Sequence, residues 1–339
     1  MHCVSVFRVS LCASLLIQIL AAQAPTSDLK VDTAERQIVL NAVVSDVKQF
    51  YFDRNIALKT ADALLAHERV GDYTHVTDGQ AFANLLVRHL IEASGDPHFT
   101  MEFTRSVFPD FSKPPAPEAN ARIRTAMEQN NCTFEKVELW PNNVGYVKLN
   151  SFPDIAVCQS KAESAMTALN RADALIFDLR DNRGGDGNMG VFLASYLFDH
   201  PEYMFSPRGP VTEQAWTRSP VAGSLLVNTP VYILTSERTY SAAEQFSYDL
   251  KMLKRATLIG QTTGGASHTG VLHNLDDHFA IGIPESRPVN PFSDKDWAVT
   301  GIEPDVKVKA ADALTTAQRL ADERVQAIKK ARASRVAVP

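Results

Sequence analysis

The sequence predicts an α/β protein with a helical N-terminal domain, and three patterns support this class. From residue 144 onward, short apolar segments typical of strands alternate with segments of helical periodicity. Residues 25–103 instead carry apolar residues at helical spacing, which predicts a small helical bundle. The proline-rich composition after residue 103 predicts that residues 104–143 link the two domains.

Three helices are expected in the N-terminal bundle. The first and third have apolar stripes, and a shorter helix is expected between Leu58 and Leu65. The stripes consist of Val39, Val43, Val47 and Phe50 in the first helix and of Phe82, Leu85, Leu86 and His89 in the third. Each helix would bury its apolar face against the others.

The α/β domain is predicted to span residues 144–310, followed by a C-terminal helix over 311–339. Its strands are expected at 145–149, 174–180, 230–235, 256–260 and 279–284, with a helix over 162–169 after the first strand. The C-terminal segment is rich in alanine, arginine and lysine, and its polar face is expected to be solvated.

Composition limits the classes of partner. The chain has 339 residues, 45% hydrophobic residues and a net charge of −5, so there is no electrostatic reason to expect nucleic acid. A peptide, protein or small-molecule partner is expected. The oligomeric state does not follow from the sequence.

Residues 1–24 resemble a signal peptide. Arg8 precedes an apolar stretch, and Ala22-Gln23-Ala24 has the form of a cleavage site. An uncleaved anchor is the alternative, but the apolar stretch is shorter than the roughly 20 residues of a spanning helix. We therefore expect an exported protein, periplasmic or secreted, without a membrane span after cleavage.

Removal of residues 1–24 would leave two cysteines, Cys132 and Cys158, in an oxidising compartment. A disulfide between them is expected. It would close a loop of about 27 residues and contribute about 3–4 kcal/mol in the chain-entropy model. Two buried free thiols are the alternative.

Ser241 is the candidate nucleophile of the chain. It lies between the apolar segment 231–234, predicted as a buried strand, and a segment of helical spacing that contains Phe246 and Leu250. The free backbone N–H groups of a helix N-terminus can stabilise an anion that forms beside the serine. The other interpretation is a capping box, because Ser241 and Glu244 have the spacing S-x-x-E.

Three stretches of sequence together resemble the S41 family of serine peptidases. They are Asp178-Leu179-Arg180-Asp181-Asn182-Arg183-Gly184-Gly185, then Tyr240-Ser241-Ala242-Ala243-Glu244 with Gly260-Gln261-Thr262-Thr263-Gly264-Gly265, and Gly301-Ile302-Glu303-Pro304-Asp305. The resemblance is closest to the tricorn core and interphotoreceptor retinoid-binding branches and extends to the carboxyl-terminal processing peptidases. It implies a crotonase/ClpP-like mixed β-sheet core.

The resemblance also implies roles for individual residues. Ser241 would attack a peptide carbonyl, and His98, in the Asp-x-His motif of residues 96–98, would act as general base. The N–H groups of Ala242 and of the Gly184-Gly185 turn would form the oxyanion hole. Substrates would be peptides or proteins, and no cofactor or metal is expected.

Two departures from the family pattern concern the groups that assist the serine. The processing peptidases have a lysine at the position of Ala266, and the tricorn-like members have an orienting glutamate at the position of Ala298. If residues 294–300 were extended, Asp296 would point to the same side as Ala298 and would take the orienting role. The alternative function is a catalytically impaired protein that binds peptides or apolar ligands.

Two further motifs suggest other functions. Residues 185–190 match G-x-G-x-x-G, but several polar residues separate the strand from the first glycine, and no acid-ended second strand follows at the expected distance. His268, His273 and His278 are spaced by five residues, which suits neither a helical zinc pair nor one strand face. We interpret these histidines as separate loop or surface residues.

Overall fold

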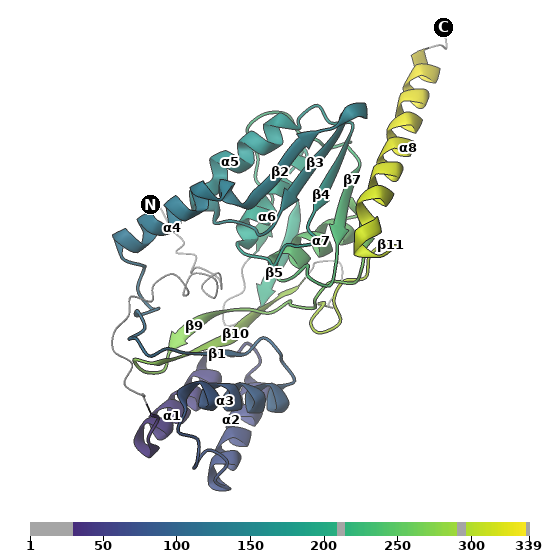
Figure 1. Ribbon diagram of the computed structural model, residues 1–339. Helices are drawn as coiled ribbons and strands as arrows, with labels where there is room; N and C mark the ends of the chain where they lie inside the picture. Colours follow the sequence, from purple (N-terminus) through teal and green to yellow (C-terminus); the bar gives the residue numbers. More distant parts are fainter. Residues whose placement is uncertain (1–29, 209–213, 290–295, 337–339) are drawn as a thin grey trace. The chain divides into compact units, whose positions relative to one another are not determined.

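A computed structural model describes residues 30–208, 214–289 and 296–336. The chain divides into two compact units, which are described in turn (Figure 1). The first unit contains the residues up to Ala116 together with Pro207–Thr212 and His268–Arg287. The second contains the rest of the chain. The expected signal peptide, residues 1–24, lies outside the described residues.

The first unit begins with three helices, each capped by an aspartate. The helices are α1 (Thr33–Phe50), α2 (Arg54–Arg69) and α3 (Gly79–Ser94). Asp32, Asp53 and Asp78 each accept a hydrogen bond from a backbone N–H of the first turn. These caps fix where the predicted helices begin.

A small antiparallel sheet completes the first unit. Its strands are β1 (Thr100–Phe103), β9 (Thr269–Asn274) and β10 (Phe279–Val289), and β10 pairs with both of the others. Phe279, Ile281 and Ile283 alternate along β10 and pack in one cluster with the apolar side chains of the three helices. A segment distant in sequence therefore supplies part of the core of this unit.

The second unit is built on a six-stranded mixed sheet of order β11-β8-β7-β4-β3-β2. Only β2 is antiparallel to its neighbour; the other neighbouring pairs are parallel. The sheet strands are β2 (Phe134–Leu139), β3 (Val144–Leu149), β4 (Ala174–Asp178), β7 (Val231–Thr235), β8 (Ala256–Gly260) and β11 (Val306–Lys307). The short strands β5 (Tyr203–Arg208) and β6 (Ala215–Trp216) pair with each other outside this sheet.

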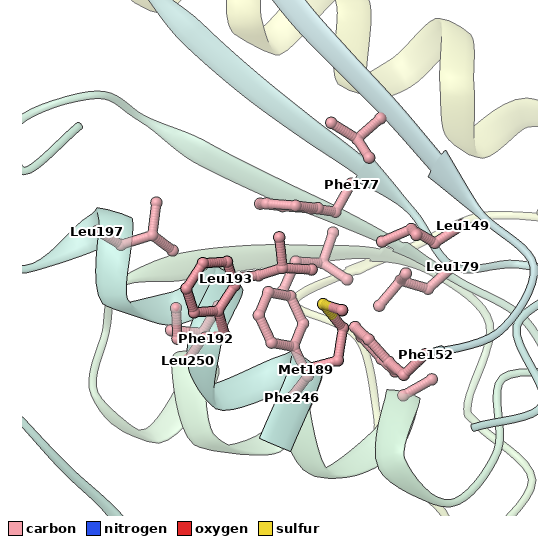
Figure 2. Packing of buried hydrophobic residues seen from close by; sticks show 14 of the residues in the cluster. Leu149, Phe152, Phe177, Leu179, Met189, Phe192, Leu193, Leu197, Phe246 and Leu250 are labelled. Atoms are coloured by element: carbon pink, nitrogen blue, oxygen red, sulfur yellow. The ribbon is translucent and has the colours of Figure 1, made fainter. Parts of the chain in front are cut away.

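Both faces of the six-stranded sheet are buried. Along β4, Leu175 and Phe177 pack into one cluster, whereas Ala174 and Ile176 pack into another. Figure 2 shows the first cluster, in which Phe177 lies among side chains that include Phe246.

The helices of this unit are α4 (Pro117–Gln129), α5 (Ile155–Ala168), α6 (Gly187–Ala194), α7 (Ala242–Met252) and α8 (Ala310–Val336), with short 3-10 turns at Asn131–Thr133, Pro141–Asn143 and Ser195–Leu197.

The second face is covered by α8, which runs alongside the sheet in Figure 1. Ala313, Ala317 and Ala321 recur every four residues and pack against Ile176 and Leu234. Small side chains at this spacing form one apolar stripe along a largely polar helix. The mixed α/β class is therefore confirmed, and α8 occupies residues 310–336 of the segment for which a C-terminal helix is predicted.

The segment expected to be a linker differs from the prediction. Residues 104–143 contain α4 and β2, because four of the five prolines in this segment lie before Glu118 and the fifth, Pro141, follows β2. Cys132, which follows α4, forms a disulfide with Cys158 in α5, and the Cα atoms are 5.8 Å apart. In the described part of the chain, no helix is long and apolar enough to cross a lipid bilayer.

Candidate active site

Ser241 ends the loop between β7 and α7 in a backbone conformation that non-glycine residues rarely adopt. Its φ is 53° and its ψ is −123°. Such a conformation costs about 1–3 kcal/mol and persists only where the surrounding structure holds it. The next residue, Ala242, begins α7, so the serine lies at the positive end of a helix.

Glu244 holds this strained turn in place. Its carboxylate accepts hydrogen bonds from the backbone N–H groups of Ser241 at 2.9 Å, Gly265 at 2.7 Å and Ala266 at 2.8 Å, and from the Thr263 hydroxyl. Burial raises the pKa of Glu244, although these hydrogen bonds oppose the rise. Glu244 thus joins the start of α7 to the turn after β8, and the capping interpretation of Ser241-x-x-Glu244 is compatible with a nucleophile.

The Gly184-Gly185 turn lies directly against Ser241. A Cβ atom on Gly184 would lie 2.7 Å from the Ser241 Cβ and 3.0 Å from the Ala242 nitrogen. A Cβ atom on Gly185 would lie 2.1 Å from the Phe152 carbonyl oxygen. The φ angles of 97° and 131° also favour glycine. Only glycine at both positions allows this close approach.

The backbone N–H groups of Gly184, Gly185 and Ala242 differ in whether they already have an acceptor. The Gly184 N–H donates to Asn182 Oδ1 at 2.8 Å. One of the two glycine N–H groups predicted for the oxyanion hole therefore already has an acceptor. Within the described ranges, the N–H groups of Gly185 and Ala242 donate to no protein acceptor.

In the first unit, His98 is held by Asp96, two residues before it. His98 Nδ1 lies 2.6 Å from Asp96 Oδ1, and the His98 backbone N–H donates to the same oxygen at 3.0 Å. Gly95, with φ of 74°, ends α3 and directs the chain into this turn. His98 Nε2 is buried and has no hydrogen-bond partner among the described residues.

Asp96 also binds two other side chains. Its Oδ2 atom lies 2.7 Å from His268 Nδ1 and 3.0 Å from the Tyr51 hydroxyl, and its side chain is 2% exposed. Burial alone would raise the pKa of Asp96, but the hydrogen bonds from His268 and His98 outweigh burial and lower it. Asp96 is therefore held as a carboxylate.

The structure changes the interpretation of the orienting acid. The predicted role of Asp296 requires residues 294–300 to be extended. In the described residues 296–300 they are not, because residues 298–300 form a turn and Asp296 Oδ1 accepts from the Ala298 N–H at 2.9 Å. Asp96 instead contacts His98 Nδ1. The signal was present in the Asp-x-His spacing, where a carboxylate two residues before the histidine can fold back onto its ring.

His268, His273 and His278, which are spaced by five residues, each have different partners. His273 Nε2 pairs with Glu285, and His278 Nδ1 bonds the Thr104 carbonyl. His268 is not a surface residue, because its side chain is 11% exposed and it joins Asp96. No sequence signal pairs His268 with a residue 172 positions away.

The fold and the serine turn together define a mixed α/β protein with a strained serine at the start of a helix. Residues 143–308 match the family model described as peptidase family S41, so the resemblance predicted from three motifs is confirmed. A carboxyl-terminal-processing protease from Synechocystis sp. is 28% identical over 169 residues, which cover 49% of this chain and 38% of that protein.

Two solved structures share the fold. A photosystem II D1 C-terminal processing protease superposes with a TM-score of 0.53 and 16% identity, covering 82% of this chain and 94% of that chain. The tricorn protease gives a TM-score of 0.52 and 14% identity, covering 87% of this chain and 37% of that chain. The chain spans less than two fifths of the Synechocystis relative it matches.

Proposed function

We propose that the protein is a serine peptidase that hydrolyses peptide bonds in peptide or protein substrates. The observation that carries the proposal is the strained Ser241 turn, with Ala242 beginning a helix and Gly184 packed against the serine. This turn lies within the residues that match the S41 family. Glycine at position 184 and the Glu244 anchor both support one fixed serine geometry, as a nucleophile requires.

In the proposed reaction, Ser241 Oγ attacks the substrate carbonyl carbon and its proton passes to His98 Nε2. The N–H groups of Ala242 and Gly185 stabilise the oxyanion, and each such donor contributes about 3–4 kcal/mol. The carbon–nitrogen bond then breaks as His98 returns the proton to the leaving amine. Water, activated by the same histidine, hydrolyses the acyl-enzyme and frees Ser241.

Asp96 is proposed as the residue that positions His98. Its contact with His98 Nδ1 would keep the proton on that nitrogen, which leaves the Nε2 lone pair available to act as base. His268 and Tyr51 hold the other carboxylate oxygen and thereby fix the carboxylate plane. A lysine base is not needed in this arrangement, which is compatible with Ala266.

The alternative of an impaired binding protein rested on the absence of an orienting acid at position 298. The contact between Asp96 and His98 weakens that reason. We therefore favour the peptidase over a protein that only binds peptides or apolar ligands.

We also propose that the protein is exported to a periplasmic or extracellular space. The signal-like residues 1–24 and the disulfide between Cys132 and Cys158 support this location. N-terminal sequencing of the protein from its native compartment should begin near residue 25. A protein recovered from the cytosol with Met1 intact would contradict export.

Hydrolysis of a fluorescein-labelled unfolded protein tests the proposed activity. Ser241→Ala and His98→Ala should each lower the rate by several orders of magnitude, because each removes a group that the chemical step requires. Ser160→Ala, on the exposed surface of α5, is the matched control and should cleave at the wild-type rate. Cleavage by Ser241→Ala at the wild-type rate would refute the assignment.

A further inference from the structure

We propose that His67, Asp72 and His89 form a binding site for a divalent metal ion, with Zn²⁺ the best match to the ligands. The site lies where α2 contacts α3 in the first unit. It uses none of the residues assigned to peptide hydrolysis, so the proposal does not depend on the proposed function.

The three side chains already converge. His67 lies in the last turn of α2, Asp72 follows in the next turn, and His89 projects from α3. One donor atom from each residue lies within 4.8 Å of the others. Asp72 Oδ2 is 2.6 Å from His67 Nδ1, and the imidazole centroids of His67 and His89 are 3.7 Å apart.

This convergence is close to what a tetrahedral zinc ion needs. Zinc bonds of about 2.0–2.2 Å place neighbouring ligand atoms roughly 3.3 Å apart, so the donor atoms must move closer by side-chain rotation. The rings of His67 and His89 lie at 12° to each other, and one ring must tilt for both lone pairs to meet at the ion. His67 is the partly exposed ring of the two, so it is the ring that can tilt.

The surroundings also resemble those of a metal site. The Tyr73 hydroxyl lies 2.9 Å from His89 Nδ1, and such outer partners fix the orientation of a ligating ring. His89 is buried, whereas the side chains of His67 and Asp72 are 34% and 42% exposed. An ion can thus enter from solvent, and water can occupy the fourth position.

Two imidazoles and one carboxylate are ligands that Zn²⁺ accepts readily. Because the ligands come from the end of α2, the turn after it and α3, a bound ion would fasten these two helices together. We therefore assign the site a stabilising role within the helical part of the first unit.

Isothermal titration of Zn²⁺ into EDTA-treated, desalted protein tests the proposal, together with thermal unfolding. The wild type should bind one ion at this site and melt at a higher temperature with Zn²⁺. His67→Ala and Asp72→Ala should each weaken this binding at least about tenfold and reduce the shift in melting temperature. Both residues are partly exposed, so both variants should fold.

Two controls separate this site from other histidines. His200→Ala removes an exposed histidine that also pairs with acids, and it should bind Zn²⁺ like the wild type. His98→Ala disrupts the other described cluster of suitable ligands, Asp96, His98 and His268, and should retain the ion at the proposed site. Wild-type affinity in both His67→Ala and Asp72→Ala, loss of all binding in His98→Ala, or no binding by the wild type would each overturn the proposal.

Discussion

At the residue scale, Asp96 is the side chain on which the proposed mechanism depends most. Its two oxygens contact two histidine rings and a tyrosine hydroxyl while the side chain is almost fully buried. A buried carboxylate is costly unless it is paired, and here each oxygen has partners. The same contacts fix the ring of His98.

Asp96→Asn should lower the peptidase rate by about 10²- to 10⁴-fold. The amide removes the negative charge that stabilises the protonated imidazole, and it can accept from only one of the two rings. Asp296→Asn is the matched control and should leave the rate unchanged. The rates at saturating substrate would decide, and equal losses in both variants would contradict the role of Asp96.

Asp96 should also make stability depend on pH in a defined direction. The folded-state pKa lies below the ordinary value of 3.8, so the stabilisation is present above that value and is lost as pH falls through the folded pKa. Urea unfolding should find Asp96→Asn less stable than the wild type at about pH 7. The difference should shrink below about pH 3; a difference that grows on acidification would be inconsistent with a lowered pKa.

At the element scale, the serine turn is defined by the loops that follow neighbouring parallel strands. The Tyr240 N–H donates to the Asn182 carbonyl at 3.0 Å, which ties the loop after β7 to the loop after β4. Glu244 adds the turn after β8. The loops after the adjacent strands β4, β7 and β8 thus hold Ser241, the start of α7 and the Gly184-Gly185 turn together.

Gly184→Ala should abolish this arrangement. The added Cβ would clash with Ser241 and with the Tyr240 carbonyl, 2.8 Å away, and it would demand a positive φ from alanine. We expect at least about a 100-fold loss of activity, as for loss of an oxyanion donor. Gly187→Ala, where a Cβ meets no atom within 4 Å, should change stability by less than about 0.5 kcal/mol and keep activity. Full activity of Gly184→Ala would argue against the close packing.

At the scale of the whole molecule, each unit supplies a different part of the proposed machinery. The first holds the histidine and its carboxylate, and the second holds the serine and the two N–H donors. The second unit also contains the one disulfide of the described residues, which joins the segment after α4 to α5.

Reduction of the Cys132 to Cys158 disulfide should lower the free energy of unfolding by about 3–4 kcal/mol, because the reduced chain gains loop entropy when unfolded. Urea unfolding with and without dithiothreitol measures this difference. A variant with both cysteines changed to serine should have the reduced stability and no response to dithiothreitol. An unchanged midpoint on reduction of the wild type would contradict the prediction.

Much of this fold could be predicted from the sequence, because the spacing of apolar residues indicates whether a helix or strand is buried on one face or on both. The strand over 174–178 and the helix that begins at 310 follow from such patterns. The proposed role of Asp96 follows from its spacing to His98, whereas the sequence interpretation gives the orienting role to Asp296. The contact with His268 could not be predicted, since only tertiary folding brings β9 beside the end of α3. The φ of Ser241 likewise depends on contacts with Glu244 and Gly184.

Labelling with a fluorophosphonate, followed by intact-mass and peptide mass spectrometry, tests the central claim most directly. The wild type should gain one adduct, located on Ser241, and Ser241→Ala should gain none. Asp96→Asn should label far more slowly, whereas Asp296→Asn should match the wild type. A wild-type protein that never labels at Ser241, or that labels equally well without it, would contradict the account.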